Sequence, residues 1–505
     1  MRKKYLFILM FIAGVIPGVA ETCGKAFGRD LEIPRTLDSI IAGGHCFKPL
    51  SDERKSALAE LRWRVRLAPK DTALQLLPGG LSLALSSLQK STITSLKITG
   101  SIDARDFKIM RDSMELLSAI DLSGATIAGY TGREGTAGDS VVHYPPGEIP
   151  RKAFYGKYLL SLFVFPPSTT SIGESSFYNC QNFKGQLLIP GAVRYIRDSA
   201  FEGCWSLDGN LEIPGSVLEI GDFAFNYCSG LTGLEIPGSV VHIGKGAFLA
   251  CKYLAGVVVL PASLDVIEEY SFARCGHLEQ VVIPNSVKHI GSYAFTMAGL
   301  TTVDLPGSLV AIGAAAFAFC GLTNLVIPNS VDSIAGDAFY SNNLGSITIP
   351  PSVSYIGSRA FYLNCHATSV YALSPVPVEL SSSPDVFYCM DSTTLHVPAG
   401  SVALYRAAGQ WKEFPRIVGL DATGQAGVST PVGVSIFPNP ATRGFYLASA
   451  AGQAVVSVFS LSGRQLLRKD VAGDGFIPVA ALPEGMYIVR VVTPERTFEC
   501  KFVKK

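Results

Sequence analysis

The residues best suited to redox chemistry or metal binding are the eleven cysteines, six of which recur at one spacing. Each of the six lies fourteen residues after a proline: Cys180, Cys204, Cys228, Cys251, Cys275 and Cys320. Two other repeats carry Ala298 and Asn342 at this position, and no histidine or second cysteine recurs at metal-ligand spacing. A position that accepts alanine favours a small buried group, and free cysteine packs as a small hydrophobic residue. We therefore expect structural thiols here and no metal site.

The remaining cysteines lie outside this ladder: Cys23, Cys46, Cys365, Cys389 and Cys500. In an exported protein, the pairs Cys23/Cys46 and Cys365/Cys389 are candidate disulfides. The sequence leaves both pairings open, because it does not give the distance between the two cysteines of either pair.

Groups that could do acid–base chemistry are present but are not arranged for catalysis. None of the seven histidines lies in an H-E-x-x-H or G-x-S-x-G motif or beside paired carboxylates. His242 and His289 share one outward position in repeats two apart, but Val266 holds that position in the repeat between them. A solvated column of side chains explains these two histidines better than a ligand pair. The sequence therefore indicates no catalytic residues, no cofactor and no enzyme activity.

The overall charge limits the class of partner. The chain has 42 basic and 41 acidic residues, and no basic block or stripe interrupts this balance. Binding to nucleic acid requires clustered lysine and arginine, so we expect no nucleic-acid partner. With 48% hydrophobic and only 16% charged residues, the composition suits a fold in which every repeat contributes to the core.

The elements that must position these residues form a repeat of 22 to 24 residues. Nine repeats each have an isoleucine followed five residues later by a phenylalanine, as in Ile220 and Phe225. A proline after a hydrophobic or aromatic residue opens each repeat: Pro166, Pro190, Pro214, Pro237, Pro261, Pro284, Pro306, Pro328 and Pro350. A repeat this short cannot bury its own apolar face, so the repeats must stack and share one continuous core.

The pattern within one repeat predicts its local structure. Alternating hydrophobic residues before Pro214 indicate a strand, which proline ends because it has no N–H to donate. Val217 and Ile220 mark a second short strand, and Gly221 allows a turn. The apolar residues from Phe225 onward have three-and-four spacing, which predicts a helical turn. We therefore predict an α/β repeat, a solenoid of short strands plus one helical turn per repeat.

The unit I-P-x-S-V-x-x-I-G-x-x-A-F-x-x-C-x-x-L closely resembles the leucine-rich repeats of the BspA type, found in surface and secreted proteins of bacteria. The resemblance implies a leucine-rich-repeat solenoid with an N-terminal cap, the repeats and a C-terminal cap: 80–142, 143–365 and 366–420. The first cap has a helix that carries Met110 and Met114, and the second contains Trp411. The resemblance also implies binding, since BspA-type proteins are linked to adhesion to host extracellular-matrix proteins and to other bacteria.

A second resemblance begins after a linker at 421–432 that is rich in small residues. Residues 433–505 alternate hydrophobic and polar side chains between turn glycines, which predicts a small antiparallel β-sandwich. The opening Pro438-Asn439-Pro440, an L-P-x-G-x-Y strand and the basic C-terminus resemble the C-terminal sorting domain of the type IX secretion system of Bacteroidota. This resemblance implies handling by the type IX secretion machinery and export across the outer membrane. An ordinary terminal sandwich domain is the alternative.

The N-terminus has the pattern of a secretory signal peptide at 1–20. Arg2, Lys3 and Lys4 precede an apolar stretch, and Gly18-Val19-Ala20 offers a cleavage site. We expect removal of this peptide to leave a secreted or outer-surface protein with no transmembrane segment. Residues 21–79 form an uncharacterised N-terminal region that matches no pattern of known function.

Two functional classes remain, and each places its site differently. The first is an adhesin that recognises host matrix or bacterial surface proteins through an outward column of the strand face: Leu188, Glu212, Glu235, Val259, Val282, Asp304, Val326 and Thr348. On this face an apolar middle with a polar rim is the candidate binding site: Glu235, Val257, Val259, Gln280, Val282 and Asp304. The preference of valine for strands is an alternative explanation of that pattern. The second class is an exported hydrolytic enzyme with its site in residues 21–142.

Overall fold

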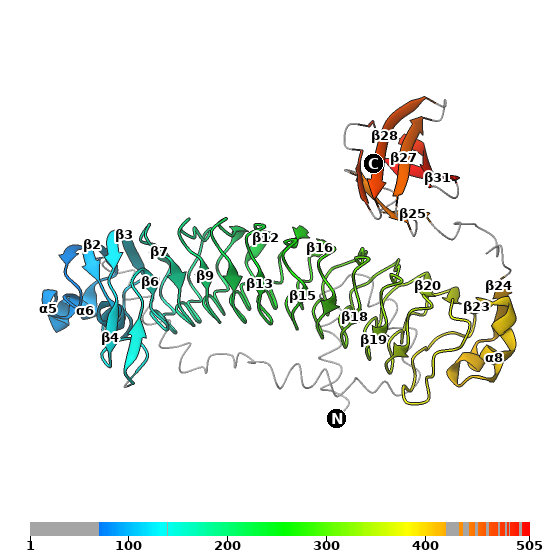
Figure 1. Ribbon diagram of the computed structural model, residues 1–505. Coiled ribbons are helices and arrows are strands. Elements are labelled where there is room, and N and C mark those ends of the chain that lie inside the picture. Colours follow the sequence, from blue (N-terminus) through cyan, green and yellow to red (C-terminus); the bar gives the residue numbers. More distant parts are fainter. Residues whose placement is uncertain are drawn as a thin grey trace. The chain divides into compact units, whose positions relative to one another are not determined.

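The computed structural model describes residues 70–138 and 140–420, together with parts of 434–504 (Figure 1). The predicted signal peptide, Cys23, Cys46 and the linker at 421–432 lie outside the described residues. The chain divides into two compact units, which we call the N-terminal unit and the C-terminal unit. The first holds the described residues up to Leu264 and the second those from Thr301 on, and the residues between are divided among the two.

The N-terminal cap begins with a parallel sheet in the order β1-β2-β3-β7. Its strands are β1 (Asp71–Leu76), β2 (Ser95–Ile102), β3 (Ala119–Ile127) and β7 (Leu162–Val164). Three helices accompany them: α5 (Leu81–Ala84), α6 (Ser87–Thr92) and α7 (Ala104–Asp112). An antiparallel hairpin follows β3, made of β4 (Tyr130–Gly132) and β5 (Val142–Tyr144). Strand β1 thus precedes residue 80, where we expected the cap to begin.

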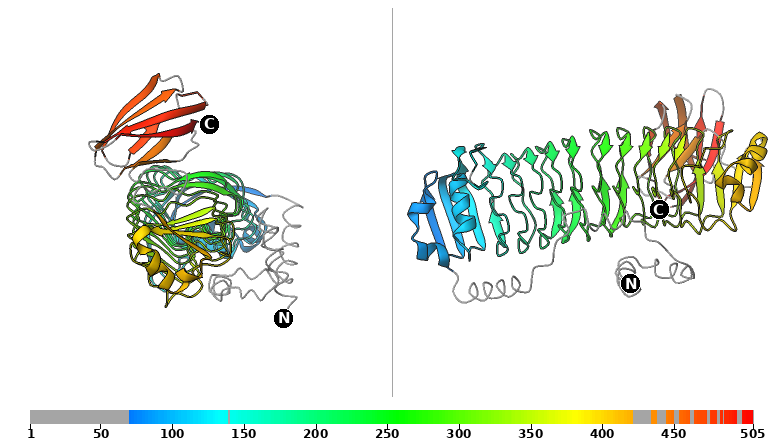
Figure 2. Two further views of the ribbon diagram at one scale, coloured as in Figure 1. Left: turned by 90° about the vertical axis from the view of Figure 1, so that its right-hand side faces the viewer. Right: turned by 90° about the horizontal axis from the view of Figure 1, so that it is seen from below.

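Helix α7 is the cap helix that the resemblance implied, although it ends before Met114. Asp103 caps its N-terminus, because the Asp103 carboxylate accepts a hydrogen bond from the Arg105 backbone N–H at 2.9 Å. Phe107 and Met110 of the helix are fully buried, and so is Met114 just past its end. Figure 2 shows the cap helices, in blue, at one end of the stacked strands.

The repeats contribute two sets of strands. Those just before the prolines have four or five residues: β10 (Gly209–Glu212), β12 (Leu231–Glu235), β14 (Gly256–Val259), β16 (Leu278–Val282) and β20 (Ser346–Ile349). In the N-terminal unit a parallel sheet of two-residue strands contains β6 (Glu148–Ile149), β8 (Ser171–Ile172), β9 (Tyr195–Ile196), β11 (Glu219–Ile220) and β13 (His242–Ile243). In the C-terminal unit the equivalent sheet contains β15 (Val266–Ile267), β17 (His289–Ile290), β18 (Ala311–Ile312), β19 (Ser333–Ile334) and β21 (Tyr355–Ile356).

The recurring P-x-S-V sequence explains the turn after each longer strand. The Val217 N–H donates to the Pro214 carbonyl at 3.0 Å, which closes a β-turn. The Ser216 hydroxyl donates to the Val193 carbonyl of the preceding repeat at 2.6 Å. Equivalent bonds come from the serines of other repeats: Ser239, Ser263 and Ser308. Serine thus ties the turns of these four repeats to the turns before them, whereas Ser286, Ser330 and Ser352 lack such a bond.

The helical turn predicted around Phe225 is not a helix. Phe223 and Tyr227 have left-handed backbone, with φ of 56° and 57°, and the Asn226 N–H donates to the Phe223 carbonyl, so this segment is a run of tight turns. The Phe225 N–H donates to the Ala247 carbonyl of the next repeat at 2.8 Å. Every second backbone donor of this segment therefore bonds to the next repeat and not within its own, which the three-and-four spacing did not reveal.

Gly221 is required by close packing between repeats rather than by the turn that we expected. A Cβ atom at Gly221 would lie 2.6 Å from the Asp198 backbone nitrogen and 2.8 Å from the Arg197 carbonyl carbon of the preceding repeat. Any larger residue would therefore push the two stacked backbones apart.

The phenylalanines five residues after the isoleucines form a buried column. In the N-terminal unit Phe225 is fully buried, and its ring stacks 5.3 Å from Phe201 and 5.5 Å from Phe248. In the C-terminal unit Phe339 stacks 5.5 Å from Phe361. The buried column and the parallel strands confirm the predicted leucine-rich-repeat solenoid, apart from its helical turn.

The six ladder cysteines are buried thiols outside any disulfide, as predicted, and five of them also donate hydrogen bonds to phenylalanine carbonyls. The Cys228 thiol donates to the Phe201 carbonyl of the preceding repeat at 3.2 Å. At the same position in another repeat, the Asn342 amide donates to the Phe317 carbonyl at 2.8 Å. The position thus favours a small donor, whereas we expected only a small side chain.

The C-terminal cap covers the last repeat with aromatic side chains. Three parallel strands follow β20, with one α-helix and two 3-10 helices: β22 (Ser369–Ala372), β23 (Thr394–Pro398), β24 (Arg416–Leu420), α8 (Val402–Ala407), η1 (Ala399–Ser401) and η2 (Gln410–Glu413). Trp411 is buried and packs 5.2 Å from Phe387, which continues the phenylalanine column. Cys365 and Cys389 form a disulfide, so one of the two candidate pairings is present.

Residues 434–504 contain two antiparallel sheets, in the orders β25-β26-β29 and β28-β27-β30-β31. The strands are β25 (Val434–Phe437), β26 (Gly444–Ser449), β27 (Gln453–Ser460), β28 (Gln465–Ala472), β29 (Gly475–Pro478), β30 (Gly485–Val492) and β31 (Thr497–Lys504). Phe445, Val456, Val489 and Phe502 lie in the core of this domain. The predicted small antiparallel β-sandwich is confirmed.

Candidate binding groove on the strand face

The candidate site lies on the strand face of the N-terminal unit, where two glutamates occupy neighbouring strands. Strands β10 and β12 pair in parallel with Glu212 opposite Glu235. Side chains alternate along each strand, so Leu211 and Leu234 are buried while both glutamates are exposed. Because neighbouring strands are about 4.8 Å apart, stacking puts two carboxylates side by side.

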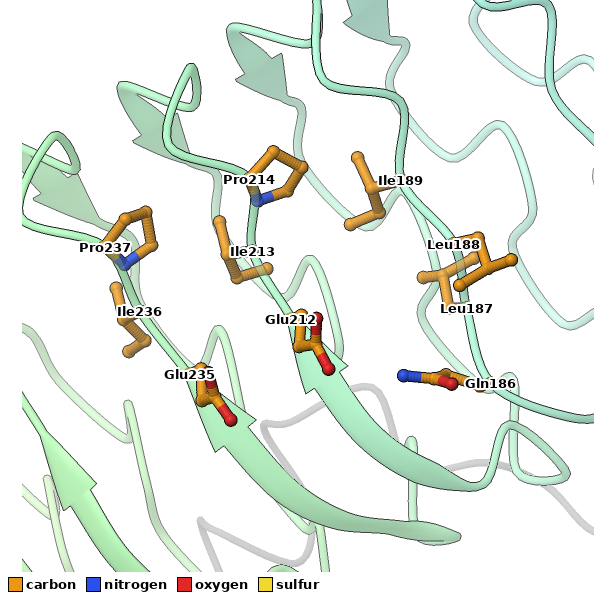
Figure 3. A pocket seen from close by; sticks show the side chains of 10 residues that line it. All are labelled: Gln186, Leu187, Leu188, Ile189, Glu212, Ile213, Pro214, Glu235, Ile236 and Pro237. Carbon is orange, nitrogen blue, oxygen red and sulfur yellow. The ribbon is translucent and has the colours of Figure 1, made fainter.

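The two glutamates belong to a groove of about 380 Å³ that crosses three repeats (Figure 3). It is lined by residues around the ends of the longer strands: Gln186, Leu187, Leu188, Ile189, Glu212, Ile213, Pro214, Glu235, Ile236 and Pro237. Figure 3 shows the carboxylates and the Gln186 amide on one side, with the isoleucines and prolines on the other. The groove therefore has a polar side and an apolar side.

The polar side carries negative charge without a cation to balance it. No basic side chain lines the groove, and among the described residues no ion pair involves Glu212 or Glu235. Asn210 donates from Nδ2 to Glu235 Oε1 at 2.8 Å, and Gln186 donates from Nε2 to the Asn210 carbonyl at 3.3 Å. These amides orient one carboxylate without neutralising it. Like charges opposite each other on adjacent strands repel, so the groove favours a cation.

An exposed apolar surface accompanies the carboxylates. Leu188 is 73% exposed, and Leu162 and Val164 of β7 are 52% and 37% exposed. Val164, Leu188, Glu212 and Glu235 each lie two residues before the proline of their repeat, so they belong to one outward column. Large aliphatic side chains left exposed beside charged groups are typical of a protein-binding surface.

Three of the six predicted binding residues are exposed in the N-terminal unit. Glu235 lines the groove. Val257 and Val259 of β14 are 51% and 57% exposed, and Val258 between them is buried. The expected outward orientation of these three side chains agrees with the structure, whereas their role in binding stays a prediction.

The other three predicted residues are less accessible. Gln280 and Val282 of β16 are half-buried. Asp304 forms a parallel bridge with Val282 and is half-buried too, and burial raises the pKa of its carboxyl above the ordinary value. Gln280 belongs to the N-terminal unit, but Val282 and Asp304 belong to the C-terminal unit. That all six residues form one patch therefore stays a prediction.

Leu188 and Glu212 were part of the predicted outward column but not of the predicted binding site. The predicted site followed the run of valines, whereas the groove follows two glutamates 23 residues apart. That separation equals one repeat, so it is the signal that could have identified the acidic pair.

The histidines and the ladder cysteines form no chemical centre in the described chain. Across 70–138, 140–420 and the described parts of the sandwich, no group of three or more His, Cys, Asp or Glu side chains could hold a metal ion. His143 interacts through Nδ1 with the Thr131 hydroxyl, and His277 with the Lys252 carbonyl, both at 2.8 Å. Among the helices that the structure describes, none is long and apolar enough to span a membrane.

Two protein-family models match the chain. One, for the BspA type leucine rich repeat region, matches in six copies over residues 147–279 and 265–378. The other, for the secretion system C-terminal sorting domain, matches residues 435–505. The first match contains every residue of the groove, and the second contains the antiparallel sandwich except Val434. A comparison with curated proteins found no match.

Several solved structures are similar to this chain. A leucine-rich repeat protein from Bacteroides ovatus is 24% identical, covers 58% of this chain and 79% of its own, and gives a TM-score of 0.44. The T. pallidum leucine rich repeat protein is 34% identical over 28% of this chain and 66% of its own, with a TM-score of 0.27. A leucine rich cell surface protein from Faecalibacterium prausnitzii is 21% identical over 55% of this chain and 79% of its own, with a TM-score of 0.29.

Proposed function

Because the chain carries leucine-rich repeats of the BspA type and a secretion system C-terminal sorting domain, we propose that it is an adhesin for host matrix or bacterial surface proteins. The observation that carries this proposal is the strand face of the N-terminal unit. Leu188, Val257 and Val259 are each more than half exposed there, beside carboxylates without an ion-pair partner, although most other apolar positions of the repeats are buried. Aliphatic groups left in water on a regular surface are stabilised when a partner covers them.

The sorting domain marks the protein for type IX secretion to the cell surface or beyond. We propose in addition that the signal peptide at 1–20 is removed during passage through the inner membrane. The mature protein then stays on the outer surface or is released. Either location gives the strand face access to proteins outside the cell.

Repeats of this class bind other molecules and do not catalyse reactions. Leucine-rich repeat proteins are binding or surface proteins without enzyme activity, and these repeats occupy residues 147–378. An exported hydrolase with its site in residues 21–142 therefore has no support from the family matches.

The test measures how purified mature protein binds to surfaces coated with extracellular-matrix proteins and to intact bacteria. We expect saturable binding to at least one of them. Replacing Val257 and Val259 together by lysine should weaken it about tenfold, because charge replaces apolar contact at the surface. The melting temperature should not change, since both side chains are exposed.

The matched control is Val241→Lys. Val241 is 58% exposed but lies just before the short strand β13, outside the longer strands that carry the proposed site, so this variant should bind like the wild type. Failure of the wild-type protein to bind any of these surfaces would contradict the proposed function.

A further inference from the structure

The groove between Glu212 and Glu235 has a charge and a spacing that select one kind of ligand. We propose that it binds an extended polypeptide segment that carries an arginine or lysine two residues from an aliphatic side chain. This assignment rests on the proposed binding function and names the chemistry of the partner.

The charge of the segment follows from the two carboxylates. Glu212 and Glu235 are opposite each other on paired strands, and no basic side chain lines the groove. A cation placed between them relieves their repulsion and pairs with both. The planar guanidinium of arginine suits this position, because it can donate N–H groups to both carboxylates at once. Asn210 already orients the Glu235 carboxylate at 2.8 Å, so less freedom is lost on binding.

The aliphatic neighbour follows from the spacing of the outward column. Leu188 lies one repeat before Glu212 in that column and is 73% exposed. With strands about 4.8 Å apart, the midpoint between the two glutamates is about 7 Å from the position of Leu188. Side chains on the same face of an extended chain are about 6.8 Å apart, which is two residues. A cation held by the glutamates therefore brings the side chain two residues away onto Leu188.

The ends of the strands decide how the segment is held. One isoleucine, Ile213 or Ile236, separates each strand from its proline, Pro214 or Pro237. The prolines have no N–H and the Ile213 N–H already donates to the Glu235 carbonyl, so the groove offers few backbone donors at these positions for a β-ladder with the ligand. Recognition therefore depends on side chains, and it should depend on sequence.

The same surface disfavours other classes of ligand. An acidic peptide or a nucleic acid would be repelled by the carboxylates. A sugar ring would lack a stacking partner, because no aromatic side chain lines the groove. A polypeptide with a cation and an aliphatic group uses both sides of the groove.

The experiment uses the mature protein and labelled, end-capped peptides in which arginine and valine are two residues apart in a serine background. A matched peptide has citrulline, a neutral group of the same shape, in place of arginine. Fluorescence anisotropy at low salt should show binding of the arginine peptide about tenfold tighter than of the citrulline peptide. The difference should shrink at high salt, because salt screens the charges.

The variant Glu212→Gln/Glu235→Gln should bind the two peptides equally. Glutamine keeps the shape of the side chain and can still accept the hydrogen bond from Asn210, so this result would report the loss of charge alone. The control Glu115→Gln/Glu134→Gln removes two exposed carboxylates outside the groove and should keep the tenfold preference. Leu188→Ser should weaken binding of the valine peptide but not of a peptide with serine in place of valine.

Equal binding of the arginine and citrulline peptides by the wild-type protein would overturn the proposal, and so would a tenfold preference that persists in Glu212→Gln/Glu235→Gln. A protein that gives either result but still adheres to coated surfaces would keep the proposed function and lose only this partner. A protein that selects the arginine peptide but adheres to no surface would keep this ligand chemistry and lose the proposed adhesin function.

Discussion

At the scale of single residues, the thiol of Cys228 does more than fill space. Its hydrogen bond satisfies the Phe201 carbonyl, a backbone acceptor that stacking has buried. Asn364 has the same role at its position, where its amide donates to the Phe339 carbonyl at 2.9 Å. Burial also raises the pKa of these thiols, to about 12 for Cys275. They therefore stay protonated, and a protonated buried thiol is a poor metal ligand and a poor nucleophile.

Lys157 is a buried charge in the N-terminal unit. It is only 7% exposed, and its ammonium group donates to the carbonyls of Arg111 and Met114 near the end of α7. Burial lowers its pKa from 10.5 to about 8, because the charged form loses the stabilisation that water provides. The carbonyls at the helix end compensate for only part of that loss.

This lysine predicts a pH dependence of stability. Between pH 8 and pH 10.5 the unfolded chain keeps the proton on Lys157, while the folded chain has released it. Lys157 should therefore contribute a rise of about 3 kcal/mol in the free energy of unfolding across this window, while the buried thiols, whose pKa is raised, contribute a fall. Urea unfolding at a series of pH values isolates the lysine, because the free energy of the wild type minus that of Lys157→Met should rise across the window. The exposed Lys184→Met is the control and should unfold like the wild type at each pH, whereas the same pH profile in Lys157→Met as in the wild type would contradict this account.

At the scale of the elements, each repeat is held mainly by its neighbours. The Phe225 N–H donates to the Ala247 carbonyl of the next repeat, and the Ser216 hydroxyl to the Val193 carbonyl of the preceding one. The Phe225 ring lies between two other rings of the column. The backbone bonds within a repeat close only tight turns, so the stacked neighbours supply most of its stability.

Phe225→Ala should therefore destabilise the solenoid by about 3–5 kcal/mol, as core aromatic truncations do. This cost combines the lost burial of apolar surface, the cavity left behind and the loss of two ring-stacking contacts. Phe223→Ala is the control, because Phe223 is the same residue type in the same turn but is only half-buried, and it should cost much less. Urea unfolding of both variants gives the two free energies. Equal costs would show that the column is not the core of the repeat.

At the scale of the whole molecule, the proposed binding groove and the sorting domain belong to different parts of the chain. The leucine-rich repeats occupy 147–378 and the sorting domain 435–505. The groove lies entirely within the repeats. Changes in the groove should therefore leave export intact, and changes in the sorting domain should leave binding intact.

Deleting residues 433–505 should trap the protein in the periplasm, because the signal for type IX export is then missing. Cell fractionation, together with protease treatment of intact cells, locates the truncated protein. Full-length Glu212→Gln/Glu235→Gln is the control and should reach the surface or medium in normal amounts. Arrival of the truncated protein outside the cell would show that the sandwich is not the export signal.

The sequence by itself determined the repeat, its core and the terminal sandwich. Pro214, Ile220 and Phe225 recur in every repeat at fixed spacing, and burial follows that spacing because equivalent residues stack on one another. Alternating side chains likewise predicted the antiparallel strands of 433–505, since a strand turns successive side chains to opposite faces.

Only the tertiary structure decided which contacts form between neighbouring repeats. The segment after Phe223 forms turns instead of a helix, because every second backbone donor, such as those of Phe225 and Tyr227, finds its acceptor one repeat away. Val259 is exposed while Val282, at the equivalent position, is half-buried, since exposure depends on the neighbouring side chains. Glu212 and Glu235 face one groove because their strands pair side by side. Their separation of 23 residues becomes a contact between neighbouring strands only when the chain has stacked.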